Sequence, residues 1–380
     1  MRRARYDGGM PQRPPARPGD RLDAIETPAL VLDLPAFERN LDAMARSVAT
    51  SGLRLRPHAK SHKCVAIARA QIARGAVGIC CQKTDEALAF VAAGIGDVLV
   101  TNEVVAPAKL ARLAQGARRA RIGLLVDDAA GATAASAAAA REGVTLDAYV
   151  EVDVGSHRCG VAAEDAGALA ARVASLAGLR FAGLHCYHGA AQHLRGPGER
   201  SSAIAAAAGV VRAAKASVAR AGLDVGIVTG AGTGTWMLER DSGIWNELQP
   251  GSYVFMDADY GRNTPADGAI AFEQSLFVIA SVMSVPAPGR AVCDAGFKAF
   301  AFDSGPPVVR GRDGLVYAKA SDEHGVLDVA PGAEPATLGE RLRLVPGHCD
   351  PTVNLYDWIV AIRDGRVEAL WPVDARGALG

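Results

Sequence analysis

The chain has 380 residues, 49% of them hydrophobic, so it is long enough for two domains or for one large barrel with an appendage. Lysine plus arginine and aspartate plus glutamate number 41 each, which leaves no net charge to attract nucleic acid or an anionic membrane. The seven cysteines lack CxxC spacing, which argues against a zinc module or a disulfide framework, and no apolar run approaches the roughly 20 residues of a membrane span. We therefore expect a soluble, cytoplasmic protein.

The first 20 residues form a separate segment. They carry Arg2, Arg3, Arg5, Arg13 and Arg17 among several prolines. No apolar stretch follows, so a secretory signal is not indicated. We expect residues 1–20 to be a flexible basic arm.

Residues 21–265 are the expected barrel domain, and from residue 54 they alternate β-prone runs with stretches rich in good helix formers, the pattern of repeated βα units around a parallel sheet. Eight strands are expected, and eight is the number that closes a (β/α)₈ barrel. A doubly wound open sheet also alternates in this way, but the strand count and the placement of the polar residues favour the barrel. The expected strands are Leu55–Lys60, Gly78–Gln82, Asp97–Thr101, Arg121–Val126, Asp147–Asp153, Arg180–Tyr187, Val225–Thr229 and Glu247–Val254. The expected helices are Cys64–Arg74, Thr84–Ala93, Ala106–Gln115, Ala129–Arg141, Ala163–Leu176 and Glu199–Ala221, with a weak one at Met237–Gly243.

Residues 266–380 have a different texture, with β-branched and turn-rich runs and few helical windows. This pattern predicts a separate antiparallel β domain, and residues 26–34, which include Pro28–Asp33, are a candidate additional strand of it. The expected strands of this domain are Leu276–Met283, Ala291–Asp294, Pro307–Arg310, Arg341–Val345 and Trp358–Arg363.

In a barrel the working residues lie at the C-terminal ends of the strands, and phosphate is usually bound by the loops after strands seven and eight. Polar residues do collect at the predicted strand ends. The Gly-rich loop Thr229–Thr235 and the segment Gly251–Tyr253 follow the last two strands and offer backbone N–H groups and hydroxyls for a phosphate. The polar strand-end residues are Arg56–Lys60, Gln82, Asn102 and Glu103, Asp153–Arg158, and Tyr187 and His188 with Gln192 and His193 beyond them.

Lys60 is a candidate for covalent binding of an aldehyde. It lies among His58, His62 and Lys63, and nearby cations favour the neutral amine that reacts with a carbonyl. The alternative is an ordinary strand-end lysine that reaches solvent.

The C-terminal domain contains two further candidate segments. His348 and Asp350 are two residues apart, so on a strand both would project from one face while Cys349 points away. Such a pair suits Mn²⁺, Zn²⁺ or Mg²⁺, although a hydrogen-bonded turn before Pro351 would look the same. Asp322, in the run Asp322–His324, is a candidate substrate contact if that turn approaches the barrel rim; otherwise it is a solvated loop.

From residue 20 to about 378, the chain resembles the fold-type III pyridoxal phosphate (PLP) enzymes of the D-threonine aldolase and D-serine dehydratase group. One departure is Ala231, where related sequences often have glycine. The motifs that carry the resemblance are Pro57–Lys63, Gly78–Lys83, Thr101–Val104, Glu151–Gly155 with Arg158–Gly160, Thr229–Gly234, Glu247–Tyr253, Asp257–Tyr260, Asp322–Gly325 and Pro346–Pro351.

The resemblance implies an alanine-racemase-like barrel with a β domain, a homodimer, and a small amino acid as substrate. It implies that Lys60 carries PLP, that Arg158 faces the pyridine nitrogen and that Gln82 and Tyr187 line the cofactor. It also implies phosphate contacts at Gly232, Thr233, Gly251 and Ser252, and a divalent metal, with Mn²⁺ preferred over Mg²⁺, Zn²⁺ or Co²⁺, at His348 and Asp350. His193 is a candidate catalytic and substrate-binding residue.

Within the group, the His-x-Asp pair favours an aldolase, because the dehydratases typically have His-x-Cys. We expect a D-threonine aldolase of low specificity, followed by 3-hydroxy-D-aspartate aldolase and then by D-serine or 3-hydroxyaspartate dehydratase. A β-carboxylate would need an additional cation near the metal, for which Arg262 or His193 is available. A PLP-binding regulatory protein would lack the second domain, and a racemase would need a tyrosine base and no metal.

Overall fold

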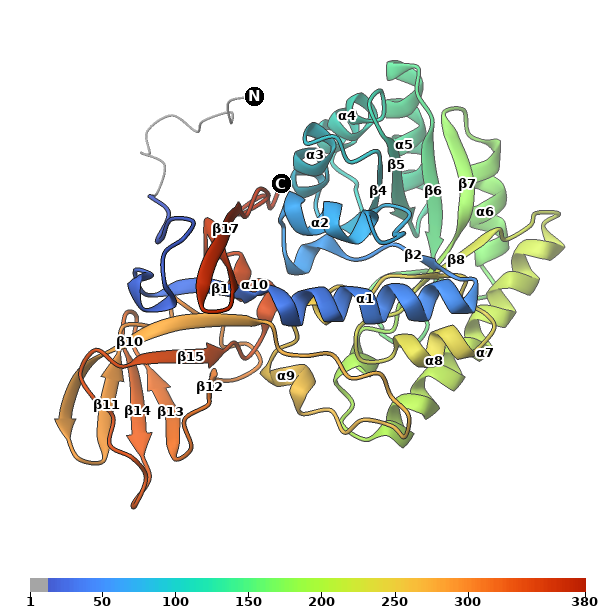
Figure 1. The fold of residues 1–380 in the computed structure, drawn as a ribbon. Helices are drawn as coiled ribbons and strands as arrows, with labels where there is room; N and C mark the ends of the chain where they lie inside the picture. Colours follow the sequence, from blue (N-terminus) through green and yellow to red (C-terminus); the bar gives the residue numbers. More distant parts are fainter. Residues whose placement is uncertain (1–12) are drawn as a thin grey trace.

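The computed structural model describes residues 13–380, and its first sheet is a parallel barrel (Figure 1). The strands are hydrogen-bonded in the order β2-β9-β8-β7-β6-β5-β4-β3, and a parallel bridge between His58 and Cys80 joins the two edges. The expected barrel is therefore confirmed. Its strands are β2 (Arg54–Leu55), β3 (Ile79–Cys81), β4 (Asp97–Glu103), β5 (Arg121–Val126), β6 (Leu146–Glu151), β7 (Leu179–Cys186), β8 (Ile227–Gly230) and β9 (Glu247–Leu248).

The first and last barrel strands are much shorter than expected. Pro57 and Pro250 interrupt them, since proline has no N–H group for the sheet ladder. Beyond each proline the chain turns into a 3₁₀ helix, η2 (Ala59–Ser61) or η4 (Ser252–Val254). The expected strand end at Lys60 is therefore a helical turn, which lies over the barrel mouth.

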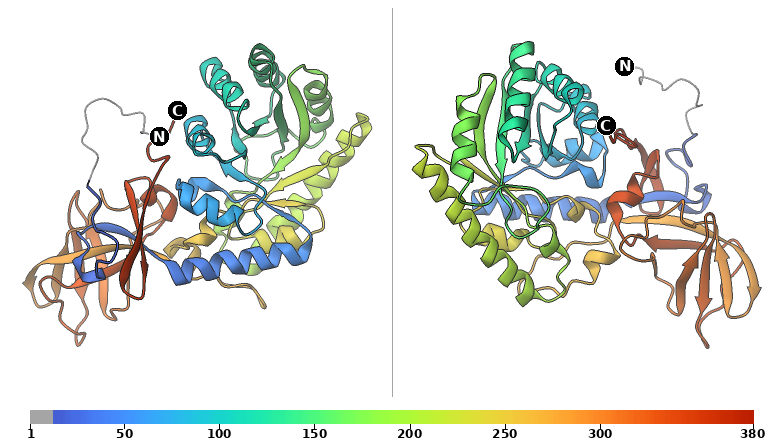
Figure 2. Two further views of the ribbon diagram at one scale, coloured as in Figure 1. Left: turned by 45° about the horizontal axis from the view of Figure 1, so that its top comes forward. Right: turned by 180° about the vertical axis from the view of Figure 1, so that it is seen from behind.

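Helices cover the outside of the barrel (Figure 2). Helix α1 precedes the first barrel strand and contacts β2 and η4, so it covers the outside of the barrel where the first and last strands pair. Helix α7 has the length and mean hydropathy to span a membrane, but its buried side chains recur at helical spacing and it packs on α6 and α8 as a barrel helix. The helices are α1 (Leu34–Ser51), α2 (Val65–Ile72), α3 (Thr84–Ala92), α4 (Pro107–Gly116), α5 (Ala129–Glu142), α6 (Ala166–Ser175), α7 (Pro197–Arg220) and α8 (Trp236–Asp241).

The second sheet is mainly antiparallel and includes a strand from near the N-terminus. Strand β1 (Ala29–Asp33) pairs antiparallel with β10 and parallel with β16, so this segment belongs to the β domain and the chain then enters the barrel through α1. The other strands are β10 (Leu276–Ala287), β11 (Arg290–Cys293), β12 (Val308–Arg310), β13 (Leu315–Ala320), β14 (Gly325–Val329), β15 (Arg341–Val345), β16 (Trp358–Arg363) and β17 (Arg366–Pro372).

Residues 13–20 differ from the expected flexible arm. The Gly19 N–H donates to the carbonyl of Val367, the Pro15 carbonyl accepts from Glu26, and Ala16 is buried. The short helix η1 (Leu22–Ala24) follows. Apolar contacts and backbone hydrogen bonds to the β domain hold this segment, while the remainder of the predicted arm, residues 1–12, lies outside the described residues.

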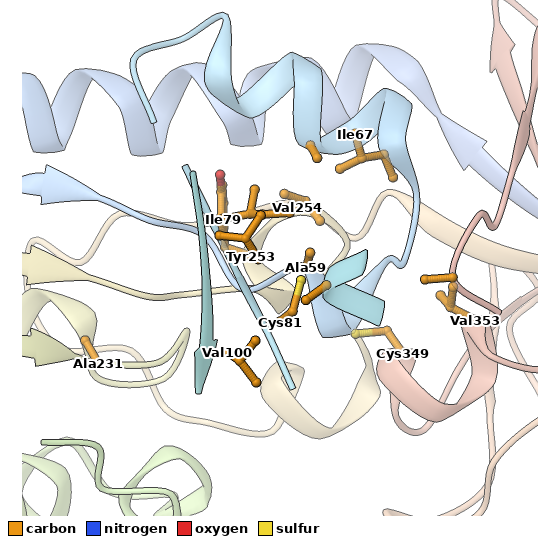
Figure 3. Packing of buried hydrophobic residues seen from close by; sticks show 14 of the residues in the cluster. Ala59, Ile67, Ile79, Cys81, Val100, Ala231, Tyr253, Val254, Cys349 and Val353 are labelled. Atoms are coloured by element: carbon orange, nitrogen blue, oxygen red, sulfur yellow. The ribbon is translucent and has the colours of Figure 1, made fainter. Parts of the chain in front are cut away.

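The two domains meet beside Lys60. Helix α10 (Cys349–Val353), which follows β15, packs on η2. Figure 3 shows Cys349 of α10 next to Ala59 of η2 and Cys81 of β3, all of them buried. This apolar contact fixes a β-domain helix at the rim of the barrel.

Candidate active site

A cavity of about 700 Å³ opens at the C-terminal ends of the barrel strands, next to α10. It brings together residues from both domains that are up to about 290 positions apart in the sequence. Its walls are formed by His58, Lys60, Gln82, Thr101, Arg158, His185, Tyr187, His193, Ala231, Gly232, Thr233, Gln249, Gly251, Ser252, Tyr260, His348 and Asp350.

Lys60 is held at the base of this cavity by η2. His58 caps the turn, since its Nδ1 accepts the Lys60 N–H at 3.2 Å, and the Lys60 Nζ lies 4.0 Å from Asp350 Oδ2. Burial disfavours the ammonium, but Tyr187 and Asp350 outweigh burial and raise the pKa of Lys60. The structure therefore differs from the expectation that neighbouring cations favour the neutral amine, because Tyr187 and Asp350 favour the ammonium.

The Gly-rich loop after β8 forms one wall with a tight backbone surface. A Cβ atom at Gly232 would lie 2.5 Å from Gln192 Oε1, and one at Gly251 would lie 2.7 Å from the His58 carbonyl oxygen. Thr233 Oγ1 is buried and lacks a hydrogen-bond partner within residues 13–380. Ala231 has φ of 72°, a conformation that glycine adopts more easily. The loop thus presents an unsatisfied hydroxyl in a cradle that larger residues could not form.

Another part of the wall carries a cation above an aromatic ring. The Arg158 guanidinium lies 5.7 Å from the centre of the Tyr187 ring, and its Nη2 is 3.6 Å from Glu151 Oε1. Gln82 is fixed by a hydrogen bond from its Nε2 to the Thr101 carbonyl. These side chains give this wall a guanidinium, an aromatic ring and an amide.

His348 and Asp350 face the cavity from the start of α10. The expected strand conformation is wrong: His348 is the N-cap of α10, and Pro351 lies in the first turn, where proline is tolerated. His348 Nδ1 is 2.6 Å from Asp303 Oδ2, which leaves Nε2 available. Burial acts against protonation of His348, but Asp350, Asp303 and Asp257 together raise the pKa of its imidazole.

His193 lies across the cavity in η3 (Ala190–His193), beside α9 (Ala258–Gly261). Its Nδ1 is 2.5 Å from Asp259 Oδ2, and the ring of Tyr260 lies against it at 5.6 Å between centres. Arg195 and Arg262 also donate to Asp259. Despite burial, these three partners lower the pKa of Asp259 to about 2.

Comparison with known proteins agrees with this geometry. The alanine racemase N-terminal domain family matches residues 32–259, and the putative serine dehydratase domain family matches residues 275–362. The chain is 50% identical to D-threonine aldolase from Arthrobacter sp., with 97% of each chain covered. The chain belongs to the D-threonine aldolase family. It is also 46% identical to 3-hydroxy-D-aspartate aldolase from Paracoccus denitrificans (strain Pd 1222), over 96% of this chain and 95% of that protein.

A solved structure of the same family superposes closely. The crystal structure of D-threonine aldolase from Filomicrobium marinum matches with a TM-score of 0.95 and 50% identity, over 96% of this chain and all of that chain. The barrel and the β domain are therefore arranged as in that member of the family.

The D-threonine aldolase family implies PLP, and the residues present fit it. Lys60 offers an amine at the cavity base, and the Gly-rich loop offers the unsatisfied Thr233 hydroxyl for a phosphate. A Cβ atom at Gly232 or Gly251 would collide with Gln192 or His58, so this part of the loop requires glycine and leaves its backbone uncovered by side chains at both positions. Arg158 and Tyr187 are placed to meet the ring.

His348 and Asp350 likewise fit a divalent metal. An imidazole whose second nitrogen binds a carboxylate, as His348 binds Asp303, is the usual arrangement at metal-ligating histidines. Asp350 Oδ1 accepts from Ser252 Oγ at 3.2 Å, so its orientation is also fixed. Cys349 Sγ is 3.3 Å from the same oxygen and does not line the cavity.

Two expected residues lie elsewhere. Asp322 is exposed on the turn between β13 and β14 and does not line the cavity of its own chain, because the turn bends back along the loop at Phe297 and Lys298. Arg262 is occupied by Asp259 and by the Ser304 carbonyl. A separate group, Glu103, Asp127 and Cys159, has ligand atoms within 4.8 Å of one another but also lies outside the cavity.

Sequence reasoning missed the supporting residues. Asp259 and Asp303 orient the two histidines of the site, and His185 and Gln249 form a hydrogen-bonded floor. Asp259 was within a motif of the resemblance, so its acidic character beside Tyr260 was a usable signal. Asp303 had no such signal, since only tertiary packing brings it to His348.

Proposed function

We propose that this protein is a D-threonine aldolase of low specificity, which cleaves β-hydroxy-D-amino acids to glycine and an aldehyde. The observation that carries the proposal is the 4.0 Å separation between Lys60 Nζ and Asp350 Oδ2 in one cavity. A substrate whose amino group is held near Lys60 has its β-hydroxyl within reach of the His348 and Asp350 pair. His193 stands on the same cavity to exchange a proton.

Lys60, Gln82, Arg158, Tyr187 and the two loops would hold PLP, and His348 and Asp350 would hold a divalent metal, for which we propose Mn²⁺. PLP supplies an electron sink for the bond broken at Cα, and a divalent metal lowers the pKa of a bound hydroxyl. The Gly-rich loop and Ser252 fix the phosphate end. Arg158 and Tyr187 orient the ring. Together these residues determine which substituent of Cα stands where it can be cleaved.

The donor set supports an aldolase over a dehydratase. Of the neighbouring residues Cys349 and Asp350, Asp350 lines the cavity, whereas Cys349 is buried with its thiol against the Asp350 carboxylate. The chain therefore has the His-x-Asp arrangement in space as well as in sequence. A carboxylate at this position is a harder ligand than a cysteine thiolate and suits Mn²⁺ or Mg²⁺.

The second candidate is 3-hydroxy-D-aspartate aldolase, which the 46% identical relative supports. Its substrate carries an additional carboxylate, which needs a cation near the β-carbon. Both Arg195 and Arg262 are bound to Asp259 and do not line the cavity. An uncharged β-substituent, as in D-threonine, is the better match to this wall.

We also propose that the protein is a cytoplasmic homodimer. All seven cysteines are free, as suits a reducing compartment. The β domain exposes Phe297, which is 48% exposed, beside the turn that carries Asp322. This apolar and acidic surface suits a second copy of the chain, and light scattering after size exclusion would give the mass.

A product assay tests the function. Purified protein with PLP and Mn²⁺ is offered D-threonine, L-threonine, D-serine and 3-hydroxy-D-aspartate, and glycine, aldehyde and oxoacid are measured. We expect glycine and acetaldehyde from D-threonine, none from L-threonine, and a lower rate with 3-hydroxy-D-aspartate. Lys60→Ala serves as the inactive control. Ammonia and an oxoacid without glycine would instead identify a dehydratase.

A further inference from the structure

We propose that Asp259 is a positioning residue that fixes His193 as the proton acceptor for the substrate's β-hydroxyl. This inference rests on the proposed aldolase function, in which His193 exchanges a proton with the substrate, and adds the residue that positions this histidine. As the Cα–Cβ bond breaks, the hydroxyl proton moves to His193 Nε2, and the oxygen's electron pair forms the aldehyde C=O bond. The pair of the broken bond remains at Cα, which takes a proton from solvent to give glycine, while His193 releases the hydroxyl proton to solvent, so one proton is gained and one is lost.

The geometry around Asp259 leaves its carboxylate ionised. Only 6% of its side chain is exposed, and it accepts hydrogen bonds from His193, Arg195 and Arg262. Hydrogen bonds from cationic donors favour the ionised carboxylate strongly. Asp259 therefore has no proton of its own to donate to the imidazole.

An ionised Asp259 determines the tautomer of His193. Because the carboxylate can only accept, Nδ1 of neutral His193 must carry the proton, and Nε2 must carry the lone pair. Asp259 does not line the cavity, whereas His193 does. The nitrogen that remains available to the substrate is therefore the basic one. The same arrangement lets a buried aspartate hold a histidine base in serine hydrolases.

The imidazole is also held in place mechanically. Arg195 donates to the Asp259 carbonyl and to Asn263 Oδ1, and Asn263 Nδ2 donates to the Gln192 carbonyl, next to His193. The backbone N–H of Asp259 binds the Gly347 carbonyl, beside His348. One short hydrogen-bond network thus connects His193 to the segment that carries His348 and Asp350. This network holds the histidine at a fixed position relative to the metal pair.

The test compares Asp259→Asn, His193→Gln and the double variant on D-threonine, with all proteins loaded with PLP and Mn²⁺. Asparagine can donate to Nδ1 and so favours the wrong tautomer. We expect Asp259→Asn to lower kcat by about 100-fold or more, the usual contribution of a general base, with KM and cofactor absorbance nearly unchanged. In the His193→Gln background, the same change should lower kcat by less than about twofold, because no base remains to be oriented.

A matched control and a direct readout separate orientation from general damage. Arg262→Gln removes another donor to the same carboxylate but leaves His193 bound, so we expect kcat within about threefold of wild type. In ¹⁵N-histidine-labelled protein, the His193 signal, assigned by its loss in His193→Gln, should report an unprotonated Nε2 in the wild type and a protonated one in Asp259→Asn.

Two results would overturn the assignment. The first is a wild-type kcat in Asp259→Asn, and the second is an equal loss in the wild-type and His193→Gln backgrounds, which would indicate a purely structural role. A wild-type enzyme that releases no glycine from any D substrate would refute the proposed function itself. That outcome is distinguishable, since it appears before any variant is compared.

Discussion

Glu239 is a buried acid directly behind the Gly-rich loop, and its titration should limit the stability of the protein above neutral pH. Its side chain is 1% exposed, Oε1 accepts from Thr235 Oγ1 at 2.8 Å, and Oε2 has no partner within residues 13–380. Burial raises the pKa of Glu239 from 4.5 to about 7. The perturbation we choose is Glu239→Gln, which keeps the acceptor for Thr235 and removes the charge.

The magnitude follows from linkage between protonation and folding. The folded protein binds the Glu239 proton more tightly than the unfolded chain does. The contribution of this proton to the free energy of unfolding is therefore complete below pH 4.5 and is lost as the pH rises to about 7. A change in pKa from 4.5 to about 7 corresponds to about 3 kcal/mol. Glutamine does not titrate. The variant should therefore be less than about 1 kcal/mol more stable than wild type at pH 5 and about 3 kcal/mol more stable at pH 8.

Urea unfolding of both proteins at pH 5 and pH 8 measures this difference. Asp241→Asn on the same helix is the control: this carboxylate is exposed and its pKa is lowered by Arg240, so its effect should not change between these pH values. A stability difference for Glu239→Gln that is the same at both pH values would refute the reasoning. It would mean that the carboxyl is solvated or paired in the folded state.

Three further predictions concern the metal pair and the core. Asp303→Asn should weaken the metal affinity by about 10- to 100-fold, measured by Mn²⁺ titration of EDTA-treated enzyme, while the cofactor absorbance persists. Cys349→Ala should retain activity and the same Mn²⁺ affinity in that titration, since Cys349 does not line the cavity; a weakened Mn²⁺ affinity would make the thiol a ligand. Leu41→Ala in α1 should lower the free energy of unfolding by about 2–5 kcal/mol, read from urea midpoints, because the side chain is fully buried; a loss below about 1 kcal/mol would contradict this packing.

The barrel was predictable because its signals are local. Each strand is a short apolar run between helical stretches, and the eight runs appear in the structure in the expected order. Helix α1 was missed although its signals were present. Asp33 caps it, Pro35 lies in its first turn, and Leu34, Phe37, Leu41, Met44 and Val48 recur at helical spacing on its buried face.

The presence of a β domain was predictable from the sequence, but the predicted list of its strands was incomplete. Strand β17 follows Asp364 and Gly365, which have φ of 50° and 72° and form a tight hairpin turn after β16. An Asp-Gly pair between two β-prone runs is a strong hairpin signal, so this strand could have been found. The pairing of β11 with β14 could not, because no local pattern specifies which distant strands meet.

The metal pair shows the limit of reasoning from spacing. Residues two positions apart share one face only if the segment is a strand. Pro351 makes a strand unfavourable here, because proline cannot donate a hydrogen bond to the sheet. In the structure His348 and Asp350 face the cavity from the start of a short helix instead. The pair was identified by residue type, but the geometry that brings it to Lys60 depends on the packing of α10 against η2.

The preference among β-hydroxy substrates depends on partners that are not visible in the sequence. Arg262 looked available to bind a β-carboxylate, yet Asp259 already binds it together with Arg195 and His193. A sequence shows how many cations a region contains, but not how many remain unpaired after folding. One buried carboxylate can thus have two effects: it engages the arginines that would recognise 3-hydroxy-D-aspartate, and it orients the histidine that either substrate would need. Specificity and catalysis at this wall are therefore expected to change together when Asp259 is altered.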